Sequence, residues 1–224
     1  MHIPDGFLSA PVWVAAGGIA AAVVAVSAAR LGKQGLEEKQ VPLMGVAGAF
    51  IFAAQMVNFP IASGTSGHLG GGVLAALLLG PWAGTLVMTA VLVVQALLFQ
   101  DGGITALGAN VLNLGILPCL LGFVLFRLLR RLLPGSRGTL IGAFLTAWLL
   151  AVLGAGLAAV QLALSGTVPL GLALPAMAGI HALIGIGEGL ITAAALAFLL
   201  RVRRDLVHPL CLPRQRKADA GQTA

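Results

Sequence analysis

The chain has 224 residues, of which 59% are hydrophobic and only 9% are charged, and its formal net charge is +6. A soluble domain usually carries about 25% charged residues, so this composition excludes a water-soluble fold and indicates an integral membrane protein. The long apolar stretches favour transmembrane helices over the short alternating strands of an outer-membrane barrel.

Transmembrane crossings follow from the apolar stretches in chain order, because each crossing needs roughly 20 residues. Residues 6–29 carry no charge and predict the first crossing. Residues 41–126 predict four crossings, with breaks at 58–67, 80–81 and 100–110, and the helix after His68 is expected to be short. Residues 138–200 predict two more crossings, with a break near 165–175.

The basic residues set the expected orientation of these crossings. All thirteen lie in three clusters, within residues 30–39, 127–137 and 201–217. The positive-inside rule places the three clusters in the cytoplasm, which argues against a nucleic-acid partner. The prediction is an all-α membrane protein, a bundle of seven transmembrane helices with the N-terminus outside and the C-terminus cytoplasmic. Residues 1–206 are expected to form one transmembrane domain, and residues 207–224 a disordered tail.

The first residues, Met1-His2-Ile3-Pro4-Asp5, carry chemistry that their neighbours do not explain. The α-amine of Met1 and the amide and imidazole nitrogens of His2 can chelate one metal ion in a plane. Ni(II) and Cu(II) favour a square of nitrogen donors, and His68 is the candidate for the fourth because it is expected on the same face. Asp5 is a candidate to orient the His2 imidazole. Each histidine alone is more often ordinary polar surface.

Several motifs resemble the CbiM/NikM family, the substrate-binding S components of energy-coupling factor (ECF) transporters for cobalt and nickel. They are "MHIPDGFLS", "EKQVPLMGVAGAFIFAAQMVNFPIASGTSGHLGGG", "ALLLGPW", "QALLFQDGGITALGANVLN" and "GIGEGLIT", and the resemblance covers about residues 1–200. It implies square-planar coordination by the Met1 amine, the His2 amide and imidazole nitrogens, and His68, which sits in the matching loop motif. That loop, "GTSGHL", looks more like the nickel-type members, so nickel is favoured over cobalt.

The resemblance also implies a biological setting. The metal is the transported substrate and not a cofactor, and the location is the inner membrane of a prokaryotic cell. The expected partners are a transmembrane T component, two ABC ATPase subunits and a small accessory membrane subunit. The chain has no G-x-x-x-x-G-K-[ST] motif, so we predict a transport subunit that is not itself an enzyme and uses ATP through its partners.

An intramembrane serine protease of the rhomboid type is the alternative. Ser66 lies in a G-x-S-G pattern, and His181 lies in a glycine-rich stretch of the last helix. Rhomboid proteases pair such a serine with a histidine on a late helix. Against this function, Ser66 precedes the apolar run of its helix, and four-residue patterns of glycine and serine are common by chance.

Other polar residues are candidates to support the metal ligands. Glu188 is the only acidic residue deep in an apolar stretch, where an ionisable group is costly and marks a function or a specific partner. It shares a helix face with His181, and the two residues either support the metal or hold the last helix against the bundle. The full set of predicted supporting residues is Asp5, Asn58, Ser66, Asn110, His181 and Glu188.

Small residues recur every four positions at Gly45, Ala49 and Ala53. Such a face lets another helix approach closely. It serves either packing within the bundle or docking to the transmembrane partner, and the resemblance favours docking.

Overall fold

The computed structural model describes residues 2–36, 38–57, 59–61 and 65–211. Its longer elements, in chain order, are α1 (Ala10–Gln34), α2 (Gln40–Gln55), β1 (Phe59–Ile61), β2 (Thr65–Gly67), α3 (Gly72–Leu79), α4 (Pro81–Leu98), α5 (Leu107–Asn110), the π-helix η2 (Val111–Leu121), α6 (Gly122–Leu132), α7 (Gly135–Leu164) and α8 (Leu170–Val202). Two short 3₁₀ turns follow, η3 (Arg204–Leu206) and η4 (Pro209–Cys211).

Elements α5, η2 and α6 form one continuous helix, so the described residues form seven helical bodies in the stretches that hydropathy predicts. Five of them are long and apolar enough to cross a membrane, which makes the chain a multi-pass membrane protein. Helix α2 is shorter, and α3 has only 8 residues. A helix of that length extends about 12 Å and cannot cross a bilayer alone. The count of seven crossings and the orientation of the termini therefore stay predictions.

The all-helical architecture is confirmed, with one detail that the sequence analysis did not predict. The break expected at 58–67 contains a small antiparallel pair of strands, in which Phe59 lies opposite Gly67 and Ile61 opposite Thr65. Pairing supplies hydrogen-bond partners to backbone groups that a connection inside an apolar protein would otherwise leave unsatisfied.

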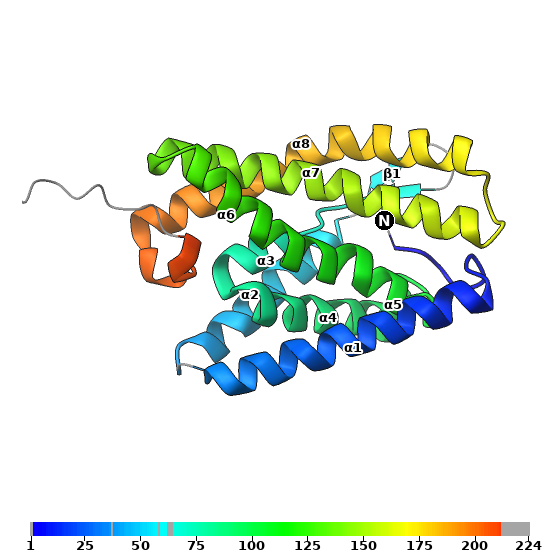
Figure 1. Cartoon of the computed structure of the whole chain (residues 1–224), viewed down its shortest axis with the longest axis horizontal. Coiled ribbons are helices and arrows are strands. Elements are labelled where there is room, and N and C mark those ends of the chain that lie inside the picture. Colours follow the sequence, from blue (N-terminus) through cyan, green and yellow to red (C-terminus); the bar gives the residue numbers. More distant parts are fainter. Residues whose placement is uncertain (1, 37, 58, 62–64, 212–224) are drawn as a thin grey trace, which may run out of the picture.

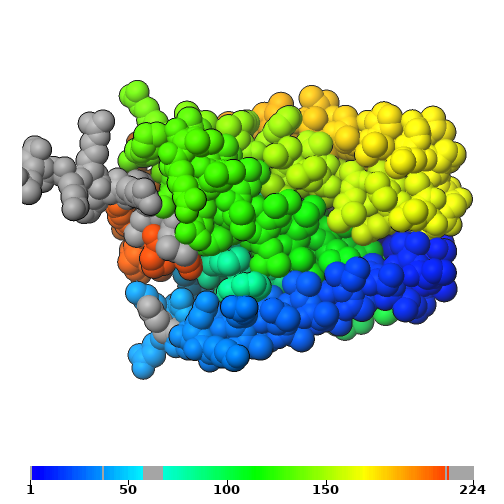
Figure 2. Space-filling view, in the orientation of Figure 1, coloured from blue at the N-terminus to red at the C-terminus, as the bar shows by residue number. Residues whose placement is uncertain are grey.

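The helices form two groups around a central element (Figure 1). Helices α7 and α8 form a long antiparallel pair on one side, and α1, α2 and α4 lie on the other. The short α3 lies between them and is almost wholly buried, because its residues Val73 to Leu77 are at most 2% exposed. Figure 2 shows α1 along the outer edge of the bundle, where its apolar side chains Val14, Ile19 and Val26 are exposed as expected for a lipid-facing surface.

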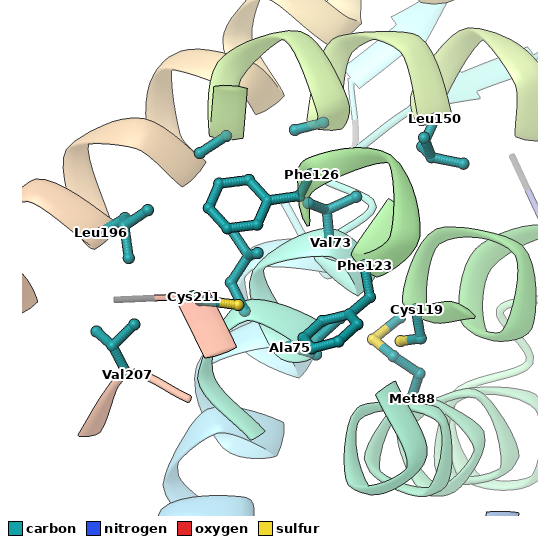
Figure 3. Packing of buried hydrophobic residues seen from close by; sticks show 14 of the residues in the cluster. Val73, Ala75, Met88, Cys119, Phe123, Phe126, Leu150, Leu196, Val207 and Cys211 are labelled. Atoms are coloured by element: carbon teal, nitrogen blue, oxygen red, sulfur yellow. The ribbon is translucent and has the colours of Figure 1, made fainter. Parts of the chain in front are cut away.

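The largest apolar cluster surrounds α3. Figure 3 shows Phe123 and Phe126 in this cluster, together with Val73 of α3, Met88 of α4 and Leu150 of α7. The inward side of α7 consists mainly of glycine and alanine, among them Gly142, Ala143, Ala147, Ala151 and Ala155. Such small residues allow helix backbones to approach closely where lipid provides no hydrophobic driving force.

The same cluster includes part of the segment that we expected to be a disordered tail. Val207 and Cys211 are 2% and 0% exposed, and the N–H of His208 donates to the carbonyl of Leu77 at 3.0 Å. Residues 207–211 therefore pack against the bundle, because the side chains of Val207 and Cys211 join the apolar cluster around α3. The rest of that segment, residues 212–224, lies outside the described residues.

The two ends of the bundle differ in charge. The α1–α2 connection, the α6–α7 connection and the end of α8 lie together at the left of Figure 1, and these are the segments that carry the three basic clusters. The start of α1 and the α7–α8 connection lie at the opposite end.

Candidate metal-binding site

The segment before α1 enters the bundle and is fixed there by backbone contacts. Ile3 is buried, and its N–H donates to Oδ1 of Asn110 at 2.8 Å. The side-chain nitrogen of Asn110 donates to the Ile3 carbonyl at 3.0 Å, and the N–H of Gly103 donates to the same carbonyl at 2.9 Å. Asn110, which the sequence analysis proposed as a supporting residue, therefore positions the residue next to His2.

Asp5 binds the loop that precedes α5. Its carboxylate accepts hydrogen bonds from the N–H of Ile104 at 3.1 Å and from the N–H and the hydroxyl of Thr105. The hydroxyl of Thr105 is the main cause that lowers the pKa of Asp5 below its usual range. These contacts tie Asp5 to the 104–105 backbone, and a different carboxylate lies beside the His2 imidazole.

That carboxylate is Asp101. Its Oδ1 lies 3.0 Å from Nδ1 of His2, and this contact is the main cause that lowers the pKa of Asp101. Nδ1 is the ring atom that closes a six-membered chelate with the backbone amide of the same residue. The sequence analysis did not select Asp101 as a site residue, although it is the only carboxylate between residues 39 and 187.

His68 lies directly after β2 and next to His2. The two imidazole rings are stacked, with centroids 4.6 Å apart and an angle of 13° between their planes. His68 is 3% exposed, and burial lowers its pKa well below 6.5, which favours the neutral form that binds metals. Its Nδ1 lies 2.9 Å from the carbonyl oxygen of Leu69. A donor at Nδ1 assigns the ring lone pair to Nε2.

Polar atoms around these rings are short of partners. Nε2 of His2 and Oδ2 of Asp101 are buried without a hydrogen-bond partner among the described residues. Burying a polar group unpaired is costly, so the arrangement favours a site that receives a polar or charged ligand. No three His, Cys, Asp or Glu side chains within the described ranges are arranged as ligands of one ion. A four-nitrogen site would therefore need backbone donors, and Met1 lies outside the described residues.

Glu188 reaches the same loop from α8. Its two carboxylate oxygens accept the N–H groups of Gly70 and Gly71 at 3.2 and 3.1 Å. Gln55 of α2, which the sequence analysis did not select, donates from its Nε2 to the Gly70 carbonyl at 2.6 Å. These two side chains thus bind the backbone two and three residues after His68.

The remaining predicted site residues do not all join this cluster. His181 is buried in α8, and its Nδ1 lies 2.8 Å from the carbonyl of Met177 in the same helix. The backbone of Ser66 pairs with Pro60 in the hairpin, whereas the Ser66 side chain and the whole of Asn58 lie outside the described part of the chain.

Helix α2 presents its small residues away from the bundle. Gly45, Ala49 and Ala53 are exposed, and an added Cβ at Gly45 would meet nothing within 4 Å. Gly45 and Ala49 line an apolar groove of about 380 Å³ between α2 and α4, with Gly48, Phe52, Val87, Ala90, Val91 and Val94 among its other residues. This surface is not used for packing inside the described bundle.

Comparisons with known proteins identify the family of the chain. Residues 2–206 match the family CbiM, described as "Cobalt uptake substrate-specific transmembrane region". The chain is 40% identical over 215 residues to a putative fused nickel transport protein NikMN of Archaeoglobus fulgidus, covering 95% of this chain and 70% of that one. It is 34% identical over 231 residues to a putative cobalt transport protein CbiM of Haloquadratum walsbyi, covering 94% and 98%.

The fold has a solved counterpart. A crystal structure of a truncated transition metal transporter superposes with a TM-score of 0.79 at 35% identity, covering 90% of this chain and 99% of that one. The helical bundle and the matched sequences define a membrane-embedded protein of the transition-metal transport class. The chain belongs to the CbiM/NikM family of cobalt and nickel transport proteins. Relatives named as transporters indicate a transporter and not an enzyme, and the protease alternative is not favoured.

Proposed function

We propose that the chain is the S component of an ECF-type transporter that captures Ni(II) or Co(II) at the outer face of the membrane. Four nitrogen atoms form the square-planar site, namely the amine of Met1, the amide and imidazole nitrogens of His2, and the imidazole of His68. A T component and two ABC ATPase subunits, with a small accessory membrane subunit, complete the transporter and drive delivery to the cytoplasm.

The stacking of the His2 and His68 rings carries this proposal. These residues are far apart in the sequence, yet both side chains are buried and their ring centroids lie 4.6 Å apart. The proposed chelate uses backbone nitrogens, which explains why a metal site need not contain a cluster of acidic or thiol side chains. The carboxylate of Asp101 next to His2 adds negative charge that favours a divalent cation.

The distribution of charge supports the outer face as the side of capture. The three basic clusters gather at one end of the bundle, and the positive-inside rule assigns such an end to the cytoplasm. The segment that holds His2 leads to the start of α1 at the opposite end.

Nickel is the preferred cargo in this proposal. Ni(II) with nitrogen donors favours a planar square, the geometry that the amine, amide and imidazole nitrogens would impose. Relatives carry both nickel and cobalt in their names, and titration with each ion in turn tests the preference.

The groove between α2 and α4 is the proposed docking surface for the T component. Its residues are small or apolar and face the surroundings of the bundle, and Gly45 and Ala49 would let a partner helix approach the α2 backbone closely.

The decisive experiment uses protein purified with its native start and loaded with Ni(II). A d–d absorption band of planar Ni(II) and one bound ion per chain are expected. His2→Ala should abolish high-affinity binding, and so should one residue added before Met1, because the amine is then displaced. The same residue added at the C-terminus is the matched control and should leave binding intact. Retained high affinity in the N-terminally extended protein would refute the site.

A further inference from the structure

The backbone between His68 and α3 is held by side chains of two different helices. Glu188 of α8 accepts the N–H groups of Gly70 and Gly71, and Gln55 of α2 donates to the Gly70 carbonyl. The Gly71 carbonyl accepts the N–H of Ala75 at 2.9 Å. Each polar group from the Gly70 nitrogen to the Gly71 oxygen therefore has a partner, as a backbone stretch in an apolar interior requires.

Close contacts fix the same stretch sterically. An added Cβ at Gly70 would lie 2.8 Å from Oε1 of Glu188, and one at Gly71 would lie 2.8 Å from Cγ2 of Ile51. Gly71 also has a φ of +76°, in the left-handed region that favours glycine. Because Gly70 and Gly71 have no side chain, the backbone at these two positions lies directly against Glu188 and against Ile51 of α2.

Helix α2 contacts the Gly70–Gly71 backbone through two of its three buried residues. Its buried residues are Ala47, Ile51 and Gln55, and the last two touch Gly71 and Gly70. Its other side carries Gly45 and Ala49, which line the groove. One short helix thus connects the groove to the backbone that carries His68.

We propose that Gln55 and Glu188 are positioning residues of the metal site, which hold the Gly70–Gly71 backbone from α2 and α8 and so keep His68 against His2. A shift of α2 relative to α8 would break the hydrogen bonds of this backbone to either Gln55 or Glu188, and His68 would move away from the metal. The T component docked in the groove would in this way weaken capture and promote release. The inference rests on the proposed function and adds the residues that link docking to metal affinity.

The test compares Gln55→Met and Glu188→Gln in the full chain with its native start, using Ni(II) alone as the probe. Gln55→Met keeps the side-chain length and removes the donor to Gly70. Glu188→Gln keeps the shape and turns one acceptor into a donor that faces an N–H. Each variant should lower Ni(II) affinity about 10–100-fold, the usual effect of losing a residue that orients a metal ligand. The d–d band should move to lower energy, toward that of His68→Ala, because a weaker oxygen donor replaces the imidazole.

A double-mutant cycle separates positioning from general damage. Once His68 is replaced by Ala, Gln55→Met and Glu188→Gln should cause no further loss of affinity. Equal losses in both backgrounds would overturn the proposal, and so would wild-type affinity and spectrum in Gln55→Met. That variant removes no charge, and it decides the question alone if Glu188→Gln does not fold.

Thr192→Val is the matched control. Thr192 lies one turn after Glu188 in α8, is 1% exposed, and has a hydroxyl without a hydrogen-bond partner among the described residues. The control should keep affinity and spectrum, and a loss equal to that of Glu188→Gln would overturn the positioning role. If wild-type protein fails to bind Ni(II), the proposed function fails. If the wild-type protein binds Ni(II) normally and the Gln55 and Glu188 variants bind it equally well, this inference fails and the proposed function stands.

Discussion

Asn110 holds both backbone polar groups of Ile3, accepting from its N–H at 2.8 Å and donating to its carbonyl at 3.0 Å. The side chain of Asn110 thus satisfies the buried backbone of Ile3, and it fixes the position of the neighbouring residue His2. The first prediction follows from its removal.

Asn110→Leu should lower Ni(II) affinity about 10–100-fold, because His2 loses the anchor that orients it. A buried N–H left without a partner also costs about 1–3 kcal/mol in stability. Calorimetric titration with Ni(II) measures the affinity, and hydrogen exchange of residues 3–8 should rise. Asn113→Leu is the control, because Asn113 bonds Gln161 and not the N-terminal segment. It should lower the melting temperature and keep the affinity.

Gly103→Ala should displace the N-terminal segment. An added Cβ would lie 2.6 Å from Oδ1 of Asp5 and 2.7 Å from the carbonyl carbon of Pro4, closer than packed carbon atoms approach. Ni(II) affinity should therefore fall at least tenfold in the same titration, of the order found when residues that orient ligands are lost. Gly171→Ala, near the start of α8 with nothing within 4 Å, should instead leave affinity unchanged. An unchanged affinity in Gly103→Ala would show that this close approach does not position His2.

Asp101→Asn should weaken Ni(II) binding by about tenfold, because the carboxylate lies 3.0 Å from the ring nitrogen of His2 that binds the ion and its negative charge attracts a divalent cation. The measurement is again a titration, with the planar d–d band retained because no nitrogen donor is lost. Asp205→Asn removes the same charge from an exposed pair with Arg203 and should have no effect. Equal losses in both variants would mean that only net charge matters.

Gly45→Leu or Ala49→Leu should fill the groove without disturbing capture. Both positions are exposed, so the purified chain should bind Ni(II) as before, whereas uptake of nickel by cells that express the whole transporter should be lost. Val46→Leu adds bulk to an exposed position of α2 that does not line the groove, and uptake should persist. Normal uptake with a filled groove would place the docking surface elsewhere.

Hydropathy was sufficient to locate the helices because glycine and proline interrupt them in a recognisable way. Gly80 has a φ of +84° and Pro81 opens α4, as the expected break at 80–81 requires. The β1–β2 pair was missed because strands of three residues leave no periodic signal. The packing of Val207 and Cys211 was missed because it depends on a space beneath α3 that only the assembled bundle creates.

The part of the candidate site that lies within consecutive residues was predictable from the sequence. A chelate formed by the first two residues follows from their covalent structure, and the same predicted face suggested His68 as its neighbour. The role of Gln55 was not predictable, because nothing in its surroundings in sequence distinguishes it from Gln95 or Gln161. Asp101, and not the predicted Asp5, lies beside His2, because a carboxylate binds whichever donors the fold brings near it.

The anchoring of residues 3–8 by much later parts of the chain sets an order of assembly. The N–H of Ile3 donates to Asn110, and the carbonyl of Phe7 accepts the hydroxyl of Thr167, so these contacts form only after residues 110 and 167 have been made. Contacts of such long sequence separation form slowly. Packing of the leading stretch onto the bundle is therefore a late step, which follows the synthesis of most of the helices.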